Sequence, residues 1–195
     1  MSDPSILLPL PADVGLPTIV LVFPAMLILL IPIIVVEGLL CKKWLGLTTW
    51  QAMKANALSN LVSTIIGIPV AWLLMFLVDF AAALLLFRTG AFDNWHSPLA
   101  KIVFVVLGSA WIGPLEGQGI WFIPAAALIL LIPFFFASYW IEYRVIKFMV
   151  GKPKHGLPAL DYPKVRIAVR NANLVTYGIM FLATSVWLVF SLPHH

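Results

Sequence analysis

Two sets of polar side chains interrupt apolar segments of this chain and could form buried contacts between helices. The candidates are Glu37 with Asn56 and Asn60, and Glu142 with Asn171 and Asn173. A carboxylate accepts hydrogen bonds from an amide, so each set can join two helices inside a membrane. The same side chains can also line a path for an ion, a proton or a lipid headgroup. The sequence leaves both interpretations open.

The positions of the two glutamates predict similar but not identical surroundings. Each glutamate falls late in an apolar segment, and its asparagines fall early in the next one. Glu37 follows Pro32 by five residues, whereas Glu142 follows Pro133 by nine. This difference of about one helical turn keeps the same helix face but shifts the depth. We therefore expect two sites near the membrane interface, within reach of water and not equivalent in detail.

One further acid and one arginine are predicted at the opposite membrane interface. Asp79 ends a long apolar run, and either Arg88 or Lys101 could pair with it. An interfacial charge explains this acid without any role in transport. His96 and His155 are expected on opposite sides of the membrane, so they predict no shared metal site.

A cluster of basic residues follows the third apolar segment and could attract anionic lipid. The candidates are Lys152, Lys154, Arg166 and Arg170. Each basic residue near an anionic leaflet contributes about 1 kcal/mol of attraction. Membrane topology alone also requires positive charge here, so the cluster is weak evidence for lipid binding. The charge is better explained by a bilayer than by nucleic acid.

Motifs for enzyme chemistry are missing from the sequence. It contains no Ser-His-Asp set, HExxH motif, Walker loop or dinucleotide fingerprint, and Cys41 is its single cysteine. A membrane enzyme acting on lipid would have to use Glu142, His155 and Asp161, which come nearest to an interfacial acid–base group. We predict no cofactor and regard enzyme activity as the weakest interpretation.

The apolar segments indicate an all-α integral membrane protein. Of its 195 residues, 62% are hydrophobic and 10% are charged, whereas soluble domains carry about 25% charged residues. Four runs are long enough to cross a bilayer, at about 17–40, 48–87, 119–141 and 165–190. Asp3 and Asp13 precede the first run without a basic residue, unlike a signal peptide. We therefore expect one transmembrane domain over residues 1–195.

The segment at about 99–115 is expected to lie at the interface or re-enter the membrane. Only 14 uncharged residues separate Lys101 from Glu116, and a span needs about 20. A fifth span here would also place the following basic cluster on the other side of the membrane. We therefore predict four spans and a non-spanning segment.

An internal repeat is predicted from two similar stretches. Residues 23–32 and 123–133 both contain Pro-Ala and end in Ile-Leu-Leu-Ile-Pro, and Ser59–Ser63 resembles Ala172–Thr176. The repeats would cover about 17–87 and 119–190, each as one helical hairpin. Two hairpins with the same topology would be related by an axis along the membrane normal.

The distribution of Lys and Arg predicts the orientation. Ten of the 12 basic residues flank the two hairpin turns, and the positive-inside rule makes that side cytoplasmic. Both termini would then lie outside the cytoplasm, in a multi-pass protein of the bacterial inner-membrane type.

Two functions are compatible with these features. The first is a small polytopic subunit or scaffold that packs against other membrane proteins or against copies of itself. The alternative is a transporter or channel component that uses the Glu/Asn pairs. Gly67 and Pro69 in the second span indicate either a hinge or a static kink.

Overall fold

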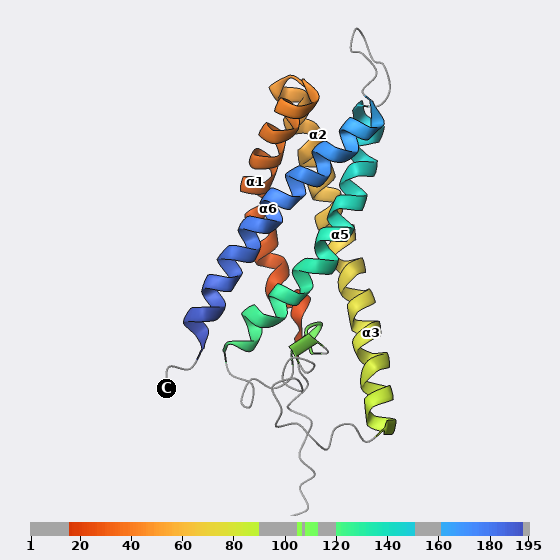
Figure 1. The fold of residues 1–195 in the computed structure, drawn as a ribbon, viewed down its shortest axis with the longest axis vertical. Coiled ribbons are helices and arrows are strands. Elements are labelled where there is room, and N and C mark those ends of the chain that lie inside the picture. The colour runs from red at the N-terminus through yellow and green to blue at the C-terminus, as the bar shows by residue number, and fades with distance from the viewer. Residues whose placement is uncertain (1–15, 90–104, 107, 113–119, 151–160, 193–195) are drawn as a thin grey trace, which may run out of the picture.

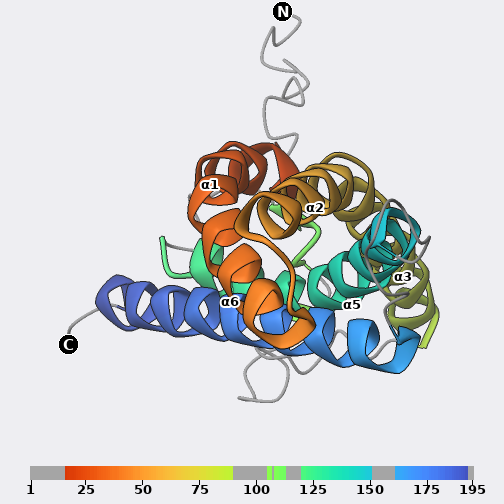
Figure 2. The same cartoon turned by 90° about the horizontal axis from the view of Figure 1, so that it is seen from above.

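The computed structural model describes residues 16–89, 105–106, 108–112, 120–150 and 161–192. Four helical segments in these residues are long and apolar enough to cross a membrane. This agrees with the predicted multi-pass, mainly helical architecture. Figure 1 shows the segments as a bundle, and Figure 2 shows it from above.

Helix α1, Thr18–Leu45, is the first spanning segment and contains Pro24 and Pro32. Membrane helices tolerate such prolines where neighbouring groups satisfy the freed carbonyls. The helix extends five residues beyond the predicted end at residue 40 and stops at Gly46, whose φ is 66°. This left-handed conformation favours glycine and terminates the helix.

The second spanning segment is built from three consecutive helical elements. They are α2, Thr49–Val62, the π-helical turn η1, Ser63–Gly67, and α3, Ile68–Thr89. The sequence offers Thr48 and Thr49 as N-cap candidates for this helix, and the structure selects Thr48, which forms a capping box with Gln51 at the start of α2. The π turn lies immediately before Pro69, which has no N–H to continue the α-helical ladder.

The other two spanning helices are α5, Phe122–Val150, and α6, Tyr162–Ser191. Helix α6 begins about three residues earlier than expected, with Pro163 in its first turn. Proline is compatible with that position because the first N–H groups of a helix have no intrahelical partner. Helix α5 has Pro124 in its first turn, and Pro133 in its interior is accommodated without ending the helix.

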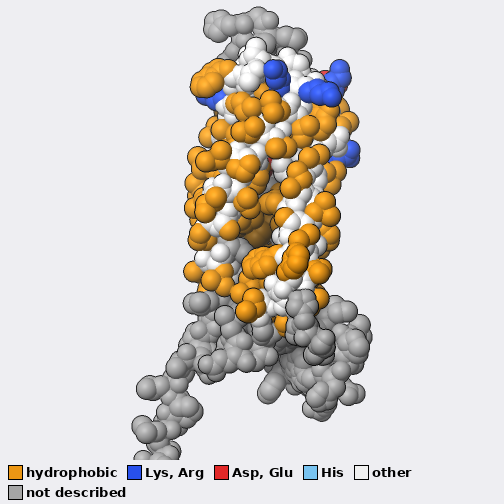
Figure 3. Space-filling view, turned by 90° about the vertical axis from the view of Figure 1, so that its left-hand side faces the viewer, with side chains coloured by type: hydrophobic (Ala, Val, Ile, Leu, Met, Phe, Trp, Pro, Cys, Tyr) orange, Lys and Arg blue, Asp and Glu red, His pale blue; other side chains and the backbone are white. Residues whose placement is uncertain are grey.

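The four segments close into a ring through side-by-side packing. Helix α1 packs against α2 and α6, and α5 packs against the same two helices, while α3 continues along α5. The α1–α2 turn and the adjoining ends of α5 and α6 lie together at the top of Figure 1. Lys and Arg side chains gather at this end in Figure 3, which we call the basic end.

The opposite end carries a short backbone pairing, which we call the strand end. Strands β1, Leu16–Pro17, and β2, Trp111–Ile112, pair antiparallel. The carbonyl of Ala110 accepts hydrogen bonds from Thr18 N at 3.1 Å and from Trp72 Nε1 at 2.7 Å. The described part of the predicted 99–115 segment is therefore fixed to α1 and α3. Most of that segment lies outside the described residues, so its relation to the membrane stays a prediction.

Asp79 differs from the open interfacial charge expected at this end. Its side chain is 6% exposed, and Oδ2 accepts a 3.3 Å hydrogen bond from Ala110 N. Its side chain is enclosed because the backbone turn at Ala110 packs over this part of α3. Lys101 and the side chain of Arg88 lie outside the described part of the structure, so neither suggested pair with Asp79 is tested.

Three apolar clusters of buried side chains occur among the described residues, one of them formed by Phe122 and Ala126. The cluster at the basic end includes Cys41, Ala55, Ile146 and Val169. The cluster towards the strand end contains Ile68, Ala71, Leu130 and Phe134. Along the helices, a set of buried polar residues lies between the cluster at the basic end and the cluster towards the strand end. We call this set the polar layer: Glu37, Asn60, Ser63, Thr64, Ser138, Glu142, Asn173 and Thr176.

Candidate functional site

Four short hydrogen bonds bring both glutamates into one site. Asn60 Nδ2 donates to Glu37 Oε2 at 2.7 Å, and Asn173 Nδ2 donates to Glu142 Oε2 at 2.6 Å. These are the predicted contacts within each hairpin. Two hydroxyl groups add contacts between the hairpins: Thr176 donates to Glu37 Oε1 at 2.7 Å, and Ser63 donates to Glu142 Oε1 at 3.0 Å. Every carboxyl oxygen therefore accepts one hydrogen bond.

The two carboxyl groups lie close enough to influence each other, since Asn60 binds Glu37, and Ser63, one helical turn further on, binds Glu142. Among the described residues, the groups that interact with the two glutamates are amides, hydroxyls and the opposite carboxyl group. None of these described partners is a Lys, Arg or His side chain. Neutral donors stabilise a carboxylate but do not cancel its charge. Two acids thus share an enclosed site in which the described part of the chain places no basic partner.

Helix register explains why the two glutamates meet. Asn60 binds Glu37, and Ser63, three residues further on, binds Glu142. Residues three apart lie on one helix face about 4.5 Å apart along the axis, so the two carboxyl groups lie at a similar level in the bundle. The expected difference in depth is therefore wrong, because the spacing from a proline within one helix does not determine how two helices are shifted along each other.

The glutamates are much less accessible than the sequence suggested. Glu37 is 1% exposed and Glu142 is 2% exposed. The apolar cluster at the basic end includes Cys41 and Ile146, each one helical turn beyond a glutamate. This packing separates the carboxyl groups from the basic end, so the expectation of easy water access from an interface is not met.

Two of the predicted asparagines do not contact a glutamate. Asn56 is buried but donates to the carbonyl of Ala52 at 2.8 Å, within its own helix. Asn171 accepts from Arg170 at 3.2 and 3.3 Å. Because Asn171 precedes Asn173 by two residues, it points to a nearly opposite helix face at 3.6 residues per turn.

The structure adds residues that sequence reasoning did not select. Ser63 and Thr176 supply the hydroxyl contacts between hairpins, and the hydroxyl groups of Ser138 and Tyr177 lie 2.8 Å apart in a further hydrogen bond. Ser63 follows Asn60 by three residues, as Thr176 follows Asn173. This i, i+3 spacing places the hydroxyl and the amide on one helix face. It is the feature of the sequence from which the two hydroxyl residues could have been predicted.

The candidate lipid-binding residues are divided between described and undescribed parts of the chain. Arg166 and Arg170 are exposed near the start of α6, and Arg166 Nε donates to Tyr139 Oη at 3.0 Å. Lys152 and Lys154 lie outside the described residues. Binding of anionic lipid by this cluster stays a prediction.

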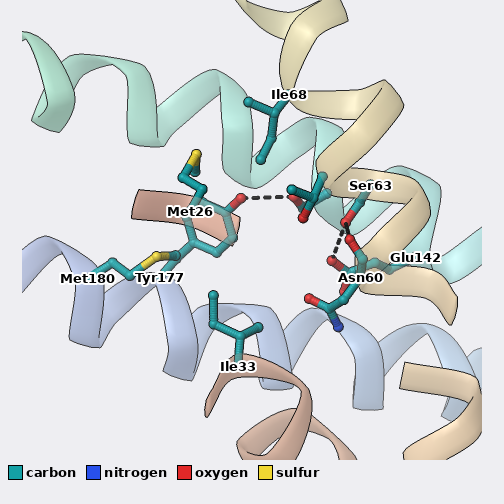
Figure 4. A pocket seen from close by; sticks show the side chains of 10 residues that line it. Met26, Ile33, Asn60, Ser63, Ile68, Glu142, Tyr177 and Met180 are labelled. Carbon is teal, nitrogen blue, oxygen red and sulfur yellow. Dashed lines mark hydrogen bonds between the residues drawn. The ribbon is translucent and has the colours of Figure 1, made fainter. Parts of the chain in front are cut away.

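A small cavity borders the polar layer on the side of Glu142. Its volume is about 20 Å³, enough for one water-sized group. Figure 4 shows Glu142, Ser63 and Asn60 at one end and Met26 and Met180 at the other. The cavity is therefore polar at one end and apolar at the other.

Comparisons with known proteins give no match for this chain. No family model matches it, and neither the curated proteins nor the solved structures contain a match.

Proposed function

We propose that this chain is a small membrane transporter, or the proton-conducting component of one, and that the Glu37–Glu142 pair binds and releases a proton. The observation that carries the proposal is the proximity of two buried carboxyl groups that have no basic partner among the described residues. Ionisable residues inside membrane bundles commonly mark ion or proton pathways. The interpretation of a transporter component thus gains support over a purely structural role.

A shared proton fits the chemistry of this pair. Two ionised carboxylates in contact repel each other, and removing each charge from water costs several kcal/mol. One proton between them removes the repulsion and supplies the donor for a carboxyl–carboxylate hydrogen bond. The amide and hydroxyl groups occupy one acceptor position on each carboxyl oxygen. A second position on each oxygen stays available for a proton shared between the two acids.

We also infer that the two hairpins are internal repeats. The matched contacts support this inference: Asn60 and Asn173 each bind the glutamate of their own hairpin, while Ser63 and Thr176 each bind the glutamate of the other. Relative rocking of the hairpins would break the hydroxyl contacts and keep the amide contacts. Such a motion offers a route for alternating access to the pair.

The same proposal includes an orientation. The end with the Lys and Arg side chains would face the cytoplasm under the positive-inside rule. Both chain termini would then lie on the other side of a bacterial inner-membrane-type bilayer. The carboxyl pair would lie nearer to the cytoplasmic ends of the helices than to their other ends.

Proton flux into liposomes tests the proposed function. The purified full-length protein would be reconstituted with a pH-sensitive dye inside, and a potassium diffusion potential would drive proton entry. We expect flux above protein-free liposomes and a loss of about tenfold or more in Glu37→Gln and Glu142→Gln. Asn171→Ala is the matched control because its amide faces away from the pair. Absence of wild-type flux, or wild-type flux in the double Gln variant, would contradict the proposal.

A second candidate function is a subunit or scaffold of a larger membrane assembly. The supporting observation is the apolar outer surface of α6, where Leu182 and Phe190 are 66% and 76% exposed. Lipid covers such a surface equally well, so this observation is weaker than the proximity of the two carboxyl groups. A stable co-purifying membrane protein in a gentle-detergent pull-down would support this function, and a monodisperse monomer without a partner would oppose it.

A further inference from the structure

The cavity beside the carboxyl pair is not symmetric with respect to the two glutamates. Glu142 is among its lining residues, together with Asn60 and Ser63, whereas Glu37 is not. A ligand in this cavity would therefore meet the carboxyl group of Glu142 first. The two acids thus have different access to a ligand, although their hydrogen bonds are matched.

An unpartnered acceptor lies beside the same carboxyl group. Asn173 donates to Glu142 Oε2 through Nδ2, while Asn173 Oδ1 is buried without a hydrogen-bond partner among the described residues. Asn173 itself is not one of the residues that line the cavity, so it acts on a ligand through Glu142. The whole residue is 1% exposed. A buried acceptor without a donor costs free energy. The surroundings of Glu142 therefore favour a ligand that donates hydrogen bonds and carries positive charge.

The apolar end of the cavity lies between two lipid-facing helices. Met26 and Ile33 belong to α1, and Met180 belongs to α6. The face formed on this side of the bundle is covered by hydrophobic side chains and is hollowed between them (Figure 3). Methionine side chains are flexible enough to adapt to an entering apolar group. A ligand can therefore approach from the hydrocarbon region, between α1 and α6.

We propose that this cavity binds the primary ammonium group of a slender amphiphile that enters sideways from the bilayer. The ammonium group would fill the cavity and donate to Glu142, and the alkyl chain would run outward past Met180 into the hollow of the lipid-facing surface. This inference rests on the proposed function and names its substrate class. The ammonium ion displaces the shared proton, so that one positive charge replaces another at the carboxyl pair.

The size and charge of the site make the proposal selective. A volume of about 20 Å³ admits one water-sized group, which is the size of a primary ammonium but smaller than a trimethylammonium. The carboxyl pair disfavours anions through charge repulsion. The site should thus distinguish three amphiphiles that share one alkyl chain and differ only in their headgroups.

Thermal unfolding of the purified protein in a non-ionic detergent tests this selectivity. Octylammonium should raise the melting temperature in a concentration-dependent way, because a ligand that binds the folded state stabilises it. Octyltrimethylammonium and octyl sulfate at the same concentrations should not. Equal shifts with all three compounds, or no shift with octylammonium, would overturn the proposal.

Two variants keep the test informative. Glu142→Gln removes the charge, and Met180→Phe fills the apolar end while leaving every hydrogen bond of the carboxyl pair in place. Each should weaken octylammonium binding about tenfold, and Gly178→Ala on the exposed face of α6 should bind like wild type. Unchanged binding in folded Met180→Phe would overturn the proposal.

The proton-flux assay separates this inference from the proposed function. Wild-type proton flux without selective octylammonium binding would leave the proton function standing and remove the amine ligand. Selective octylammonium binding without proton flux would support the cavity as a ligand site and contradict proton conduction.

Discussion

Ser63 Oγ donates a 3.0 Å hydrogen bond to Glu142 Oε1, joining residues that are 79 positions apart in the chain. Thr176 makes the corresponding contact with Glu37 across 139 positions. These two hydroxyl groups tie the first hairpin to the second inside the polar layer. The carboxyl pair therefore depends on how the hairpins are placed against each other.

Removal of either hydroxyl group should weaken the contact between hairpins. Ser63→Ala and Thr176→Val should each lower the free energy of unfolding by about 1 kcal/mol, since each leaves a buried carboxyl oxygen without its donor. Equilibrium unfolding in mixed detergent micelles would measure this change. Ser59→Ala is the matched control, because its buried hydroxyl donates to the backbone carbonyl of Asn56 and to no carboxyl group. An equal loss in all three variants would show that the hydrogen bonds to the carboxyl groups contribute no more to the free energy of unfolding than the bond from Ser59 to the backbone.

The start of α2 should depend on Thr48 and not on Thr49. Thr48→Ala removes an N-cap whose side chain accepts from Gln51 N at 3.3 Å, so we expect a loss of about 1 kcal/mol in the free energy of unfolding. Thr49→Ala changes a neighbouring exposed residue in the first helical turn. It should have an effect within about 0.5 kcal/mol. Comparable losses in the two variants would contradict the capping box as the source.

Much of the helical architecture follows from local features of the sequence. Uninterrupted apolar runs predict the four spanning segments, and the position of Thr48 and Thr49 before such a run predicts a helix start without deciding between the two. The Glu37–Asn60 and Glu142–Asn173 contacts were also predictable, because consecutive antiparallel helices bring these residues to similar depth. These features need only the period of a helix and the direction of the chain.

The relative placement of the hairpins could not be predicted in the same way. The contacts of Ser63 and Thr176 require knowledge of which helix faces lie against the other hairpin. The burial of Glu37 and Glu142 likewise depends on apolar packing from all four segments. Asn171 shows the same limit, since its position early in the last apolar segment selected it, but the helix face on which it lies excludes it from the site.

The glycine that ends α1 should resist substitution, in contrast to a glycine within α6. Gly46 has a φ of +66°, which costs a residue with a Cβ about 1–2 kcal/mol. Gly178 has no atom within 4 Å of a substituted Cβ, and alanine favours helix by about 1 kcal/mol. We therefore expect Gly46→Ala to lower, and Gly178→Ala to raise, the free energy of unfolding in detergent. Changes of the same sign would show that backbone conformation does not dominate at these two positions.

The contact between α3 and Ala110 should be sensitive to a single indole group. Trp72→Phe keeps an aromatic ring but loses the 2.7 Å hydrogen bond from Nε1 to the carbonyl of Ala110. Since this carbonyl also accepts from Thr18 N, we expect about 1 kcal/mol of destabilisation and faster hydrogen exchange at the Thr18 amide. Mass spectrometry of exchanged peptides would measure the local effect.

Trp50→Phe provides the control for that experiment, because Trp50 is 76% exposed at the other end of the bundle. Its substitution should leave the exchange of the Thr18 amide unchanged. If Trp72→Phe also leaves this exchange unchanged, the indole hydrogen bond does not hold the backbone at Ala110 against the bundle. In that case the β1–β2 pairing and the hydrogen bonds of Ala110 with Thr18 and Asp79 account for the position of this segment.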